Sequence, residues 1–395
     1  MNILIINSSI LPYPPAQGGA VENLIDMFVK NNENNKRHKI TICTIYDKKA
    51  IEFEKKYLFC DFIHIKKNMF FQIKNIFKVL KRKITGKYCA NEYLSNVIKK
   101  IENNIQEFDL VIVENVPQFG LELRKLSPKK LVLHMHNDNL NVFTKQALEI
   151  KNSYDEIWCL SKYVVNMVKE INEDNDKVKL LYNGINVDNY LKQLDDDKVN
   201  KYKLKFGIEN NDKVIMYSGR LVKEKGIMEL LKSFNDMKIA STKLLVVGSY
   251  SYGKNKNTKF IKELKEIAKS NSNIIFTGYV DYDDMPYIYK LCDFGVVPSI
   301  CEEGFALSVV EFFISGKPII TTNSGAIPEI VDNSCAILIN KHKKFRKNLG
   351  SALKVMIDNY KNYDSEYCKD IAKKFTTDKY CKRFEELVGD IVNEN

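Results

Sequence analysis

The sequence predicts a chain of two doubly wound α/β domains. Short apolar, β-branched runs alternate with helical patterns along its whole length, which is typical of parallel strands buried on both faces. A length of 395 residues exceeds what one ordinary core holds and suits two domains. The runs also form one series in each half of the chain, and each series predicts a sheet covered by helices.

The individual elements follow from these runs. Predicted strands of the first series are residues 2–9, 39–46, 108–115, 130–137 and 155–161, and those of the second are 177–183, 213–219, 243–249, 273–279, 293–299 and 317–323. Helical spacing of apolar residues lies between them, for example over residues 21–32 and 226–237.

The domain boundary is predicted near Asn183-Gly184, a turn signal that an acidic, solvated run follows. This gives one domain at 1–185 and a second at 186–372, followed by an amphipathic helix over 373–395. A ligand is expected in a cleft between the two domains, at the carboxyl ends of their strands.

Composition narrows the class of protein. No apolar run approaches the ~20 residues that span a bilayer, and the N-terminus has no basic leader, so we expect a cytoplasmic protein. The net charge of +11 suits phosphate-bearing ligands, nucleic acid or an anionic membrane. Nucleic acid is the weakest of these, because the sequence has no recognition helix, stacking motif or zinc module.

Three segments contain candidate ligand-binding residues. Gly18-Gly19 lies between the first strand and its helix, where backbone amides approach a phosphate, although a plain turn has the same pattern. Arg220 follows the strand at 213–219, and Lys225 precedes a helix, so the two cations suit a diphosphate if they are not merely solvated.

The third segment holds two glutamates, Glu303 and Glu311, with seven residues between them. We expect a helix to start near residues 304–307, with Glu303 before it and Glu311 about two turns inside. The helix N-terminus would then offer amides to a diphosphate, and the carboxylates would accept hydrogen bonds from sugar hydroxyls. An ordinary amphipathic helix with surface glutamates is the alternative.

Together these segments resemble retaining glycosyltransferase family 4, whose fold is called GT-B. The matching stretches are GGAVE, HND, YNGIN, SGRLVKEKG, FTGYV, and the two-glutamate segment with its trailing SGKPIITTNSGAIPEIV. They follow the family's order and cover most of the chain, and the last one is the most specific. The resemblance implies two Rossmann-like domains that face each other across a cleft, and a C-terminal helix that crosses back onto the first. It also implies that the domain at 1–185 binds the acceptor and that the domain at 186–372 binds the nucleotide sugar.

The resemblance also implies roles. Glu303 would bind the donor sugar, Glu311 the ribose, Arg220 and Lys225 the diphosphate, and His136 the donor sugar as an active-site residue. Further donor contacts are implied for Gly19, Tyr279, Val280, Gly304, Phe305, Ala306 and Leu307. Many members carry glycine where Ala306 stands, which affects donor identity more than donor binding. A UDP-sugar is the favoured donor, and a glycan or lipid-linked acceptor of surface polysaccharide synthesis is expected.

We expect no metal and no cofactor. Three acidic triplets, at 174–176, 195–197 and 281–283, are interpreted as solvated, because Arg220, Lys225 and a helix N-terminus already match the diphosphate. His134 competes with His136, but only His136 stands in the family's position. No residue is a clear covalent nucleophile. The resemblance implies retention by attack on the face that the leaving group vacates, with the departing phosphate taking the acceptor proton.

Residues 66–87 predict membrane contact. They hold eight Lys or Arg and no acidic residue, with apolar residues at helical spacing. Such a basic amphipathic helix suits peripheral docking to anionic lipid on the inner face of the cell membrane, unless its apolar side packs into the first domain. Two other functions stay open at this stage: a catalytically idle sugar-nucleotide-binding protein of the same fold and, less favoured, a nucleic-acid-binding protein.

Overall fold

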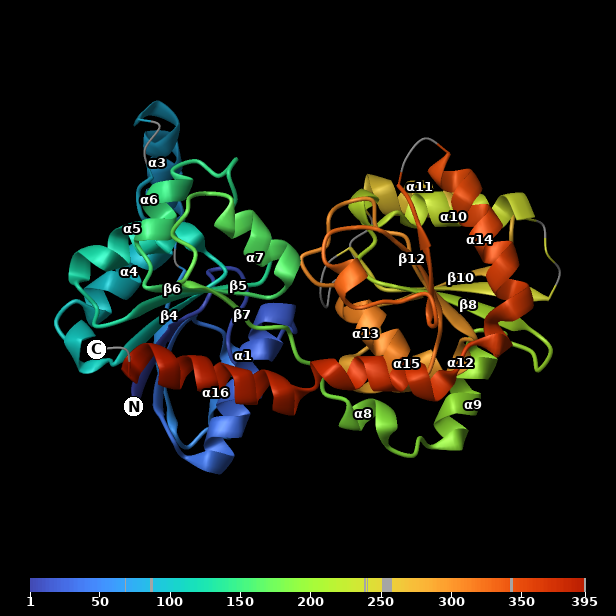
Figure 1. The fold of residues 1–395 in the computed structure, drawn as a ribbon, viewed down its shortest axis with the longest axis horizontal. Helices are drawn as coiled ribbons and strands as arrows, with labels where there is room; N and C mark the ends of the chain where they lie inside the picture. The colour runs from blue at the N-terminus through green and yellow to red at the C-terminus, as the bar shows by residue number, and fades with distance from the viewer. Residues whose placement is uncertain are drawn as a thin grey trace. The chain divides into compact units, whose positions relative to one another are not determined.

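A computed structural model describes residues 1–67, 69–85, 88–237, 239, 241–250, 258–341 and 344–393, and the chain forms two compact units (Figure 1). Unit 1 comprises Met1–Asn183 and Tyr380–Asn395, and unit 2 comprises Gly184–Lys379. The first boundary lies two residues before the predicted one. The chain re-enters unit 1 seven residues later than predicted, because Phe375 and Thr377 are still bonded to the backbone of Ile185, at 2.8 and 3.0 Å.

Unit 1 is built on a seven-stranded parallel sheet of order β3-β2-β1-β4-β5-β6-β7. Its strands are β1 (Asn2–Ile6), β2 (Lys39–Ile45), β3 (Cys60–Ile65), β4 (Leu110–Glu114), β5 (Leu131–Met135), β6 (Glu156–Cys159) and β7 (Val178–Leu180). Its helices are α1 (Ala20–Asn35), α2 (Lys48–Glu54), α3 (Met69–Thr85), α4 (Glu92–Ile101), α5 (Gly120–Leu123), α6 (Ala147–Asn152) and α7 (Lys162–Lys169).

Unit 2 is built on a six-stranded parallel sheet of order β10-β9-β8-β11-β12-β13. Its strands are β8 (Lys213–Ser218), β9 (Thr242–Val247), β10 (Ile274–Gly278), β11 (Phe294–Val297), β12 (Ile319–Thr322) and β13 (Ala336–Ile339). Its helices are α8 (Asp188–Leu191), α9 (Asp196–Lys205), α10 (Ile227–Met237), α11 (Lys259–Ala268), α12 (Met285–Leu291), α13 (Leu307–Ile314), α14 (Phe345–Asn359) and α15 (Ser365–Ala372). The predicted pair of doubly wound α/β domains is confirmed.

The strand predictions fail at the sheet edges. The run at 177–183 was assigned to the second series, but β7 pairs with β6 in the first sheet. The strands β3 and β13 are missing from the prediction. All three are edge strands, where one side lacks a neighbour, so their sequences do not need the long apolar run that marks an interior parallel strand.

The C-terminal helix α16 (Thr377–Asn393) completes the core of unit 1, as predicted. Figure 1 shows this helix, in red, lying beside α1. The Phe384 ring stacks on Phe28 of α1 with ring centroids 3.9 Å apart. The α16 side chains buried with α1 and the sheet are Tyr380, Cys381, Phe384, Leu387, Val388 and Ile391. The last helix therefore belongs to the N-terminal fold although it ends the chain.

Because every strand in each sheet is parallel, all strands of one sheet end at the same edge. The loops that follow the strands gather there, and this carboxyl edge is where doubly wound folds bind ligands. The candidate residues of each unit are found at its own carboxyl edge.

Candidate functional site

In unit 2 the candidate cations follow β8, and Glu303 follows β11, which pairs with β8. Arg220 comes two residues after β8, and Lys225 ends a short 3-10 turn at Lys223–Lys225. Arg220 is exposed, and no carboxylate in the described part of the chain pairs with it. Its fork of donors is therefore free to engage an anion.

Lys225 and Glu303 form an ion pair. The Lys225 ammonium donates to both carboxylate oxygens of Glu303, at 2.6 and 2.7 Å, and the Ser299 hydroxyl donates to the same carboxylate. The side chains are 24% and 8% exposed, so the pair is largely shielded from water. The prediction gave these residues separate roles, toward diphosphate and sugar. Their contact means that a ligand engaging one of them also acts on the other.

The segment that trails the two glutamates holds Glu303 in place. The Ala326 amide donates to the Glu303 carbonyl at 2.8 Å. Gly325 has a φ of +52°, and a Cβ there would lie 2.2 Å from the same carbonyl oxygen. Glycine is therefore required for the loop to approach so closely. The SGAIPE segment thus supports the backbone of Glu303.

The helix after Glu303 begins at the last residue of the predicted range. Helix α13 starts at Leu307 and Ala306 precedes it in a non-helical conformation, so Gly304, Phe305 and Ala306 form a loop. Glu311 therefore lies about one turn into the helix and not two, which corrects the prediction. The amides at the start of α13 point out of the helix, as an anion site at a helix N-terminus requires.

Glu311 is held by a buried tyrosine. The Tyr289 hydroxyl of α12 donates to its carboxylate at 2.8 Å. Burial raises the pKa of Glu311, and this hydrogen bond opposes the rise. Tyr289 is fully buried and packs edge-on against Phe312 at 4.8 Å, so its hydroxyl is fixed in position. Tyr289 was missed in the sequence, because its spacing from Glu311 has no local pattern.

The remaining predicted residues of unit 2 are Tyr279 and Val280. They follow β10, which lies two strands from β8 at the same edge of the sheet. Tyr279 is partly exposed. Within the described ranges no hydrogen bond or ion pair joins either residue to the other predicted ones, so their donor contact stays a prediction.

The acidic triplets have structural roles where contacts are described. Asp195 caps α9 by accepting from the Asp197 amide at 3.0 Å, and Asp174 pairs with Lys177 at 2.9 Å. Asp281 directly precedes a 3-10 turn at Tyr282–Asp284. None of the three belongs to a cluster of metal-ligating side chains within the described residues.

In unit 1, Gly19 directly precedes α1. Its φ is +124°, and a Cβ there would lie 2.1 Å from a carboxylate oxygen of Glu22. The glycine therefore leaves room for a buried carboxylate in the first turn of α1. Burial raises the pKa of Glu22 to about 7. Glu22 lies inside the GGAVE stretch but was not predicted as a site residue.

His136 lies in a buried cluster with His134 and Glu114. The last residue of β4, Glu114, stands opposite His134 of β5 in the sheet. His136 is two residues further and points to the same side as His134. One carboxylate oxygen of Glu114 lies 2.6 Å from His136 Nε2 and 3.1 Å from His134 Nδ1. All three side chains are at most 3% exposed.

The pKa values of Glu114 and His136 both lie below their ordinary values. Burial opposes the charge of Glu114, but His134 and His136 lower its pKa to about 2. Burial, aided by the nearby His134, lowers the pKa of His136 to about 4, although Glu114 opposes this shift. Glu114 was not singled out in the sequence. Its signal was a charged residue at the end of the otherwise apolar run LVIVE.

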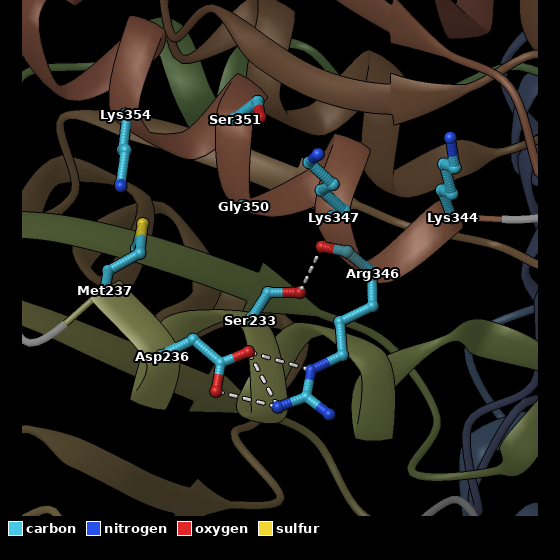
Figure 2. A pocket seen from close by; sticks show the side chains of 9 residues that line it. All are labelled: Ser233, Asp236, Met237, Lys344, Arg346, Lys347, Gly350, Ser351 and Lys354. Carbon is cyan, nitrogen blue, oxygen red and sulfur yellow. Dashed lines mark hydrogen bonds and ion pairs between the residues drawn. The ribbon is translucent and has the colours of Figure 1, made fainter.

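A separate pocket of about 510 Å³ lies between α10 and α14 (Figure 2). Its lining is rich in cations, but Arg346 donates to both carboxylate oxygens of Asp236 at 2.9 and 2.7 Å. Figure 2 shows the Arg346 side chain folded toward this aspartate. No predicted site residue lines the pocket, so it is distinct from the carboxyl-edge site of unit 2.

The predicted membrane segment is helix α3, whose apolar side is exposed. Side chains that project into solvent are Met69, Ile73, Ile76, Phe77, Leu80 and Ile84, with Ile84 85% and Phe77 67% exposed. The alternative, an apolar side packed into the first domain, is therefore wrong for these residues. Lys78 differs from the expectation of a free cation, because it pairs with Glu92 at 2.9 Å. Residues 68, 86 and 87, and the side chains of residues 70 and 81–83, lie outside the described part.

Within the described ranges, no helix combines the length and the apolar character that crossing a bilayer requires.

The chain is similar in sequence to several known glycosyltransferases. Residues 198–372 match the family described as glycosyl transferases group 1. The chain is 25% identical to the lipopolysaccharide 1,2-N-acetylglucosaminetransferase of Salmonella typhimurium, over 71% of this chain and 72% of that protein. It is 32% identical to the capsular polysaccharide biosynthesis glycosyltransferase CapM of Staphylococcus aureus, over 40% of each.

Its fold resembles that of Anabaena HepE, solved in complex with UDP and with UDP-glucose. The TM-score is 0.76 at 17% identity, covering 99% of this chain and 100% of the HepE chain. This likeness confirms the predicted GT-B fold.

Proposed function

We propose that this chain, which matches the group 1 glycosyltransferases over residues 198–372, transfers a sugar from a UDP-sugar to a glycan or lipid-linked acceptor. The anomeric configuration is retained, and the product belongs to a surface polysaccharide. HepE binds UDP and UDP-glucose, and the two relatives act in lipopolysaccharide and capsule synthesis, which supports this donor and acceptor class.

The observation that carries the proposal is the Lys225–Glu303 ion pair at the ends of the paired strands β8 and β11, with the exposed Arg220 just after β8. A nucleotide diphosphate that leaves a sugar develops negative charge, and groups already in position stabilise it best. Arg220 and Lys225 provide this charge in unit 2 without a metal ion. Glu303, which shares Lys225, accepts hydrogen bonds from the donor sugar.

The other donor contacts follow from the same arrangement. Glu311, oriented by Tyr289, binds the ribose hydroxyls. Amides from Phe305 to Leu307 approach the diphosphate and sugar. His136 of unit 1 contacts the donor sugar.

The reaction proceeds through an oxocarbenium-like sugar. The bond from C1 to the diphosphate breaks, and the acceptor hydroxyl attacks the face that the leaving group vacates. A phosphate oxygen of the leaving group takes the hydroxyl proton. This route retains the configuration without a covalent enzyme intermediate.

The test is an assay across UDP-, GDP- and ADP-sugars, with and without a lipid-linked acceptor. We expect UDP release and a product whose anomeric configuration, read by proton NMR, equals that of the donor. An inverted product would contradict the retaining route. Calorimetric binding of UDP without release from any donor would favour the idle sugar-nucleotide-binding protein instead.

We further propose that α3 brings a cytoplasmic enzyme to the inner face of the cell membrane. Its apolar residues are exposed next to lysines such as Lys74, and each cation near an anionic surface contributes ~1 kcal/mol. A helix of this kind lies in the interface and does not cross it.

Vesicle co-sedimentation tests this attachment. Replacing Ile76 and Phe77 together with Ser should reduce binding to anionic vesicles and leave UDP binding unchanged. Leu204 of α9 is 82% exposed in unit 2, so Leu204→Ser is the matched control and should sediment like the parent. If the double variant also sediments like the parent, α3 is only a solvated helix.

A further inference from the structure

The cluster of Glu114, His134 and His136 carries an inference beyond the roles already described. Both histidines approach the same carboxylate oxygen, Oε2 of Glu114, from β5 and from the residue just after it. A carboxylate only accepts hydrogen bonds, so the 2.6 Å contact requires the proton to be on His136 Nε2. In a neutral imidazole the other nitrogen, Nδ1, then carries a lone pair.

The backbone around His136 is fixed by the same two strands. The His136 amide donates to the Asn115 side chain at 3.0 Å, and the Asn115 amide donates to the His134 carbonyl at 2.8 Å. The ring is therefore held at both its backbone and its Nε2 atom. Because one bond holds the His136 backbone amide and another holds ring atom Nε2, the direction in which Nδ1 points is fixed.

His136 Nδ1 is buried and has no hydrogen-bond partner in the described part of the chain. Buried polar atoms nearly always have a partner, and one without a partner calls for an explanation. A hydroxyl donor from a bound ligand would satisfy this lone pair. The orphaned nitrogen at the carboxyl edge of the sheet is thus an observation that points to a ligand.

We infer that Glu114 is a positioning residue that holds His136 in its Nε2–H form, so that Nδ1 accepts a hydrogen bond from a sugar hydroxyl. His134 supports it from the other side. Its ring packs against Tyr380, Trp158 and Phe384, and its Nδ1 lies 3.1 Å from the same oxygen. The inference rests on the proposed function only in naming the ligand as a sugar.

The geometry favours a hydrogen bond over a metal ion. Glu114, His134 and His136 offer three atoms within 4.8 Å of one another, a set that suits zinc. In a metal site, however, the ligand atoms all direct lone pairs at the ion and cannot hydrogen-bond to each other. The 2.6 Å contact between Glu114 and His136 is the distance of a charge-assisted hydrogen bond.

Nitrogen NMR of the five histidines tests the inference directly. The parent should show His136 protonated at Nε2 and unprotonated at Nδ1, with the signal assigned from a His136→Gln variant. Adding UDP-glucose should shift Nδ1. A shift that appears only when the acceptor is added would assign the hydroxyl to the acceptor and not to the donor. A parent protein with the proton on Nδ1, or with bound zinc by elemental analysis, would overturn the inference.

The variant Glu114→Gln sharpens the test. A glutamine can turn either its NH2 group or its oxygen toward Nε2, so it no longer fixes the proton there. A mixture of the two His136 tautomers is expected, and kcat should fall by roughly 10- to 100-fold, by analogy with partners that orient metal-bound histidines. Glu156→Gln is the control, because Glu156 is equally buried on β6 but accepts from Trp158. It should leave kcat and the His136 signal unchanged.

The outcomes separate this inference from the proposed function. If Glu114→Gln keeps both the proton on Nε2 and the parent kcat, Glu114 does not position His136. If the tautomers become mixed as expected but the parent releases UDP from no donor, the positioning stands and the proposed function fails.

Discussion

The two carboxyl edges of this protein differ in how they hold charge. At the edge of unit 2, two cations follow β8, and one of them pairs with Glu303 after β11. At the edge of unit 1, a single buried carboxylate serves two histidines and no cation is paired with it among the described residues. Similar parallel sheets thus present an exposed arginine beside a Lys–Glu ion pair in one unit and a neutral imidazole in the other.

The difference suits two tasks. Charge that develops on a leaving diphosphate needs permanent cations, and Arg or Lys supplies them at any physiological pH. A sugar hydroxyl instead needs an oriented acceptor, which a neutral, fixed imidazole offers. The comparison predicts that mutations at unit 2 affect the leaving group and the nucleotide, whereas those at unit 1 affect the sugar.

The largest effect is expected from Arg220→Ala. It removes a free cation from the leaving-group site and should lower kcat by ~10²- to 10³-fold, by analogy with the loss of one preorganised donor. Arg346→Ala is a matched control, because Arg346 pairs with Asp236 at the separate α10–α14 pocket. Equal kcat values for parent and Arg220→Ala would show that Arg220 does not stabilise the leaving group.

The two glutamates of unit 2 should separate nucleotide from sugar. Loss of a hydrogen bond to a charged group costs about 1.5–3 kcal/mol, which is roughly 10- to 100-fold in affinity. Glu311→Ala should weaken UDP and UDP-glucose alike, whereas Glu303→Ala should weaken UDP-glucose more. Calorimetric titration of both ligands decides the matter, and identical losses in both variants would refute the division of roles.

A smaller effect is expected from Tyr289→Phe. The variant removes one hydrogen bond to Glu311 and leaves the carboxylate in place. A typical bond of this kind contributes about 0.5–1.5 kcal/mol, so UDP affinity should fall by roughly 2- to 10-fold. In the Glu311→Ala background the same change should have no effect on UDP affinity. A full loss there would show that Tyr289 acts on its own.

Excess EDTA should have the smallest effect, with activity retained. Arg220 and Lys225 provide the positive charge in this account, so a chelator removes nothing that the diphosphate needs. Loss of activity that Mg²⁺ or Mn²⁺ restores would contradict the metal-independent proposal. The acidic triplets would then have to be examined again as metal ligands.

How much the sequence could reveal also differs between the two edges. Glu303, Lys225 and Arg220 lie in continuous segments whose glycines and charges mark them, and even the support from Gly325 belongs to the same stretch. Glu114 stands 20 or more residues from either histidine, and only the pairing of β4 with β5 brings it to them. Tyr289 meets Glu311 through packing of α12 on α13, which no local pattern encodes.

The start of α13 shows the same limit. The spacing of Glu303 and Glu311 suggested that Glu311 lies two turns inside the helix, but the chain is not helical through Ala306, and the Ala326 amide is bonded to the Glu303 carbonyl before it. The spacing alone does not encode this contact. Edge strands such as β3 were missed for a related reason. Their sequences lack the long apolar run that marks an interior parallel strand.

Hydrogen exchange with and without UDP tests the central claim most directly, because it locates the nucleotide without assuming any residue's role. The account predicts slower exchange in the loop after β8, through Gly226, and in residues 303–311, with little change around the α10–α14 pocket. Protection confined to that pocket, or to unit 1, would contradict the assignment of the donor site to the carboxyl edge of unit 2.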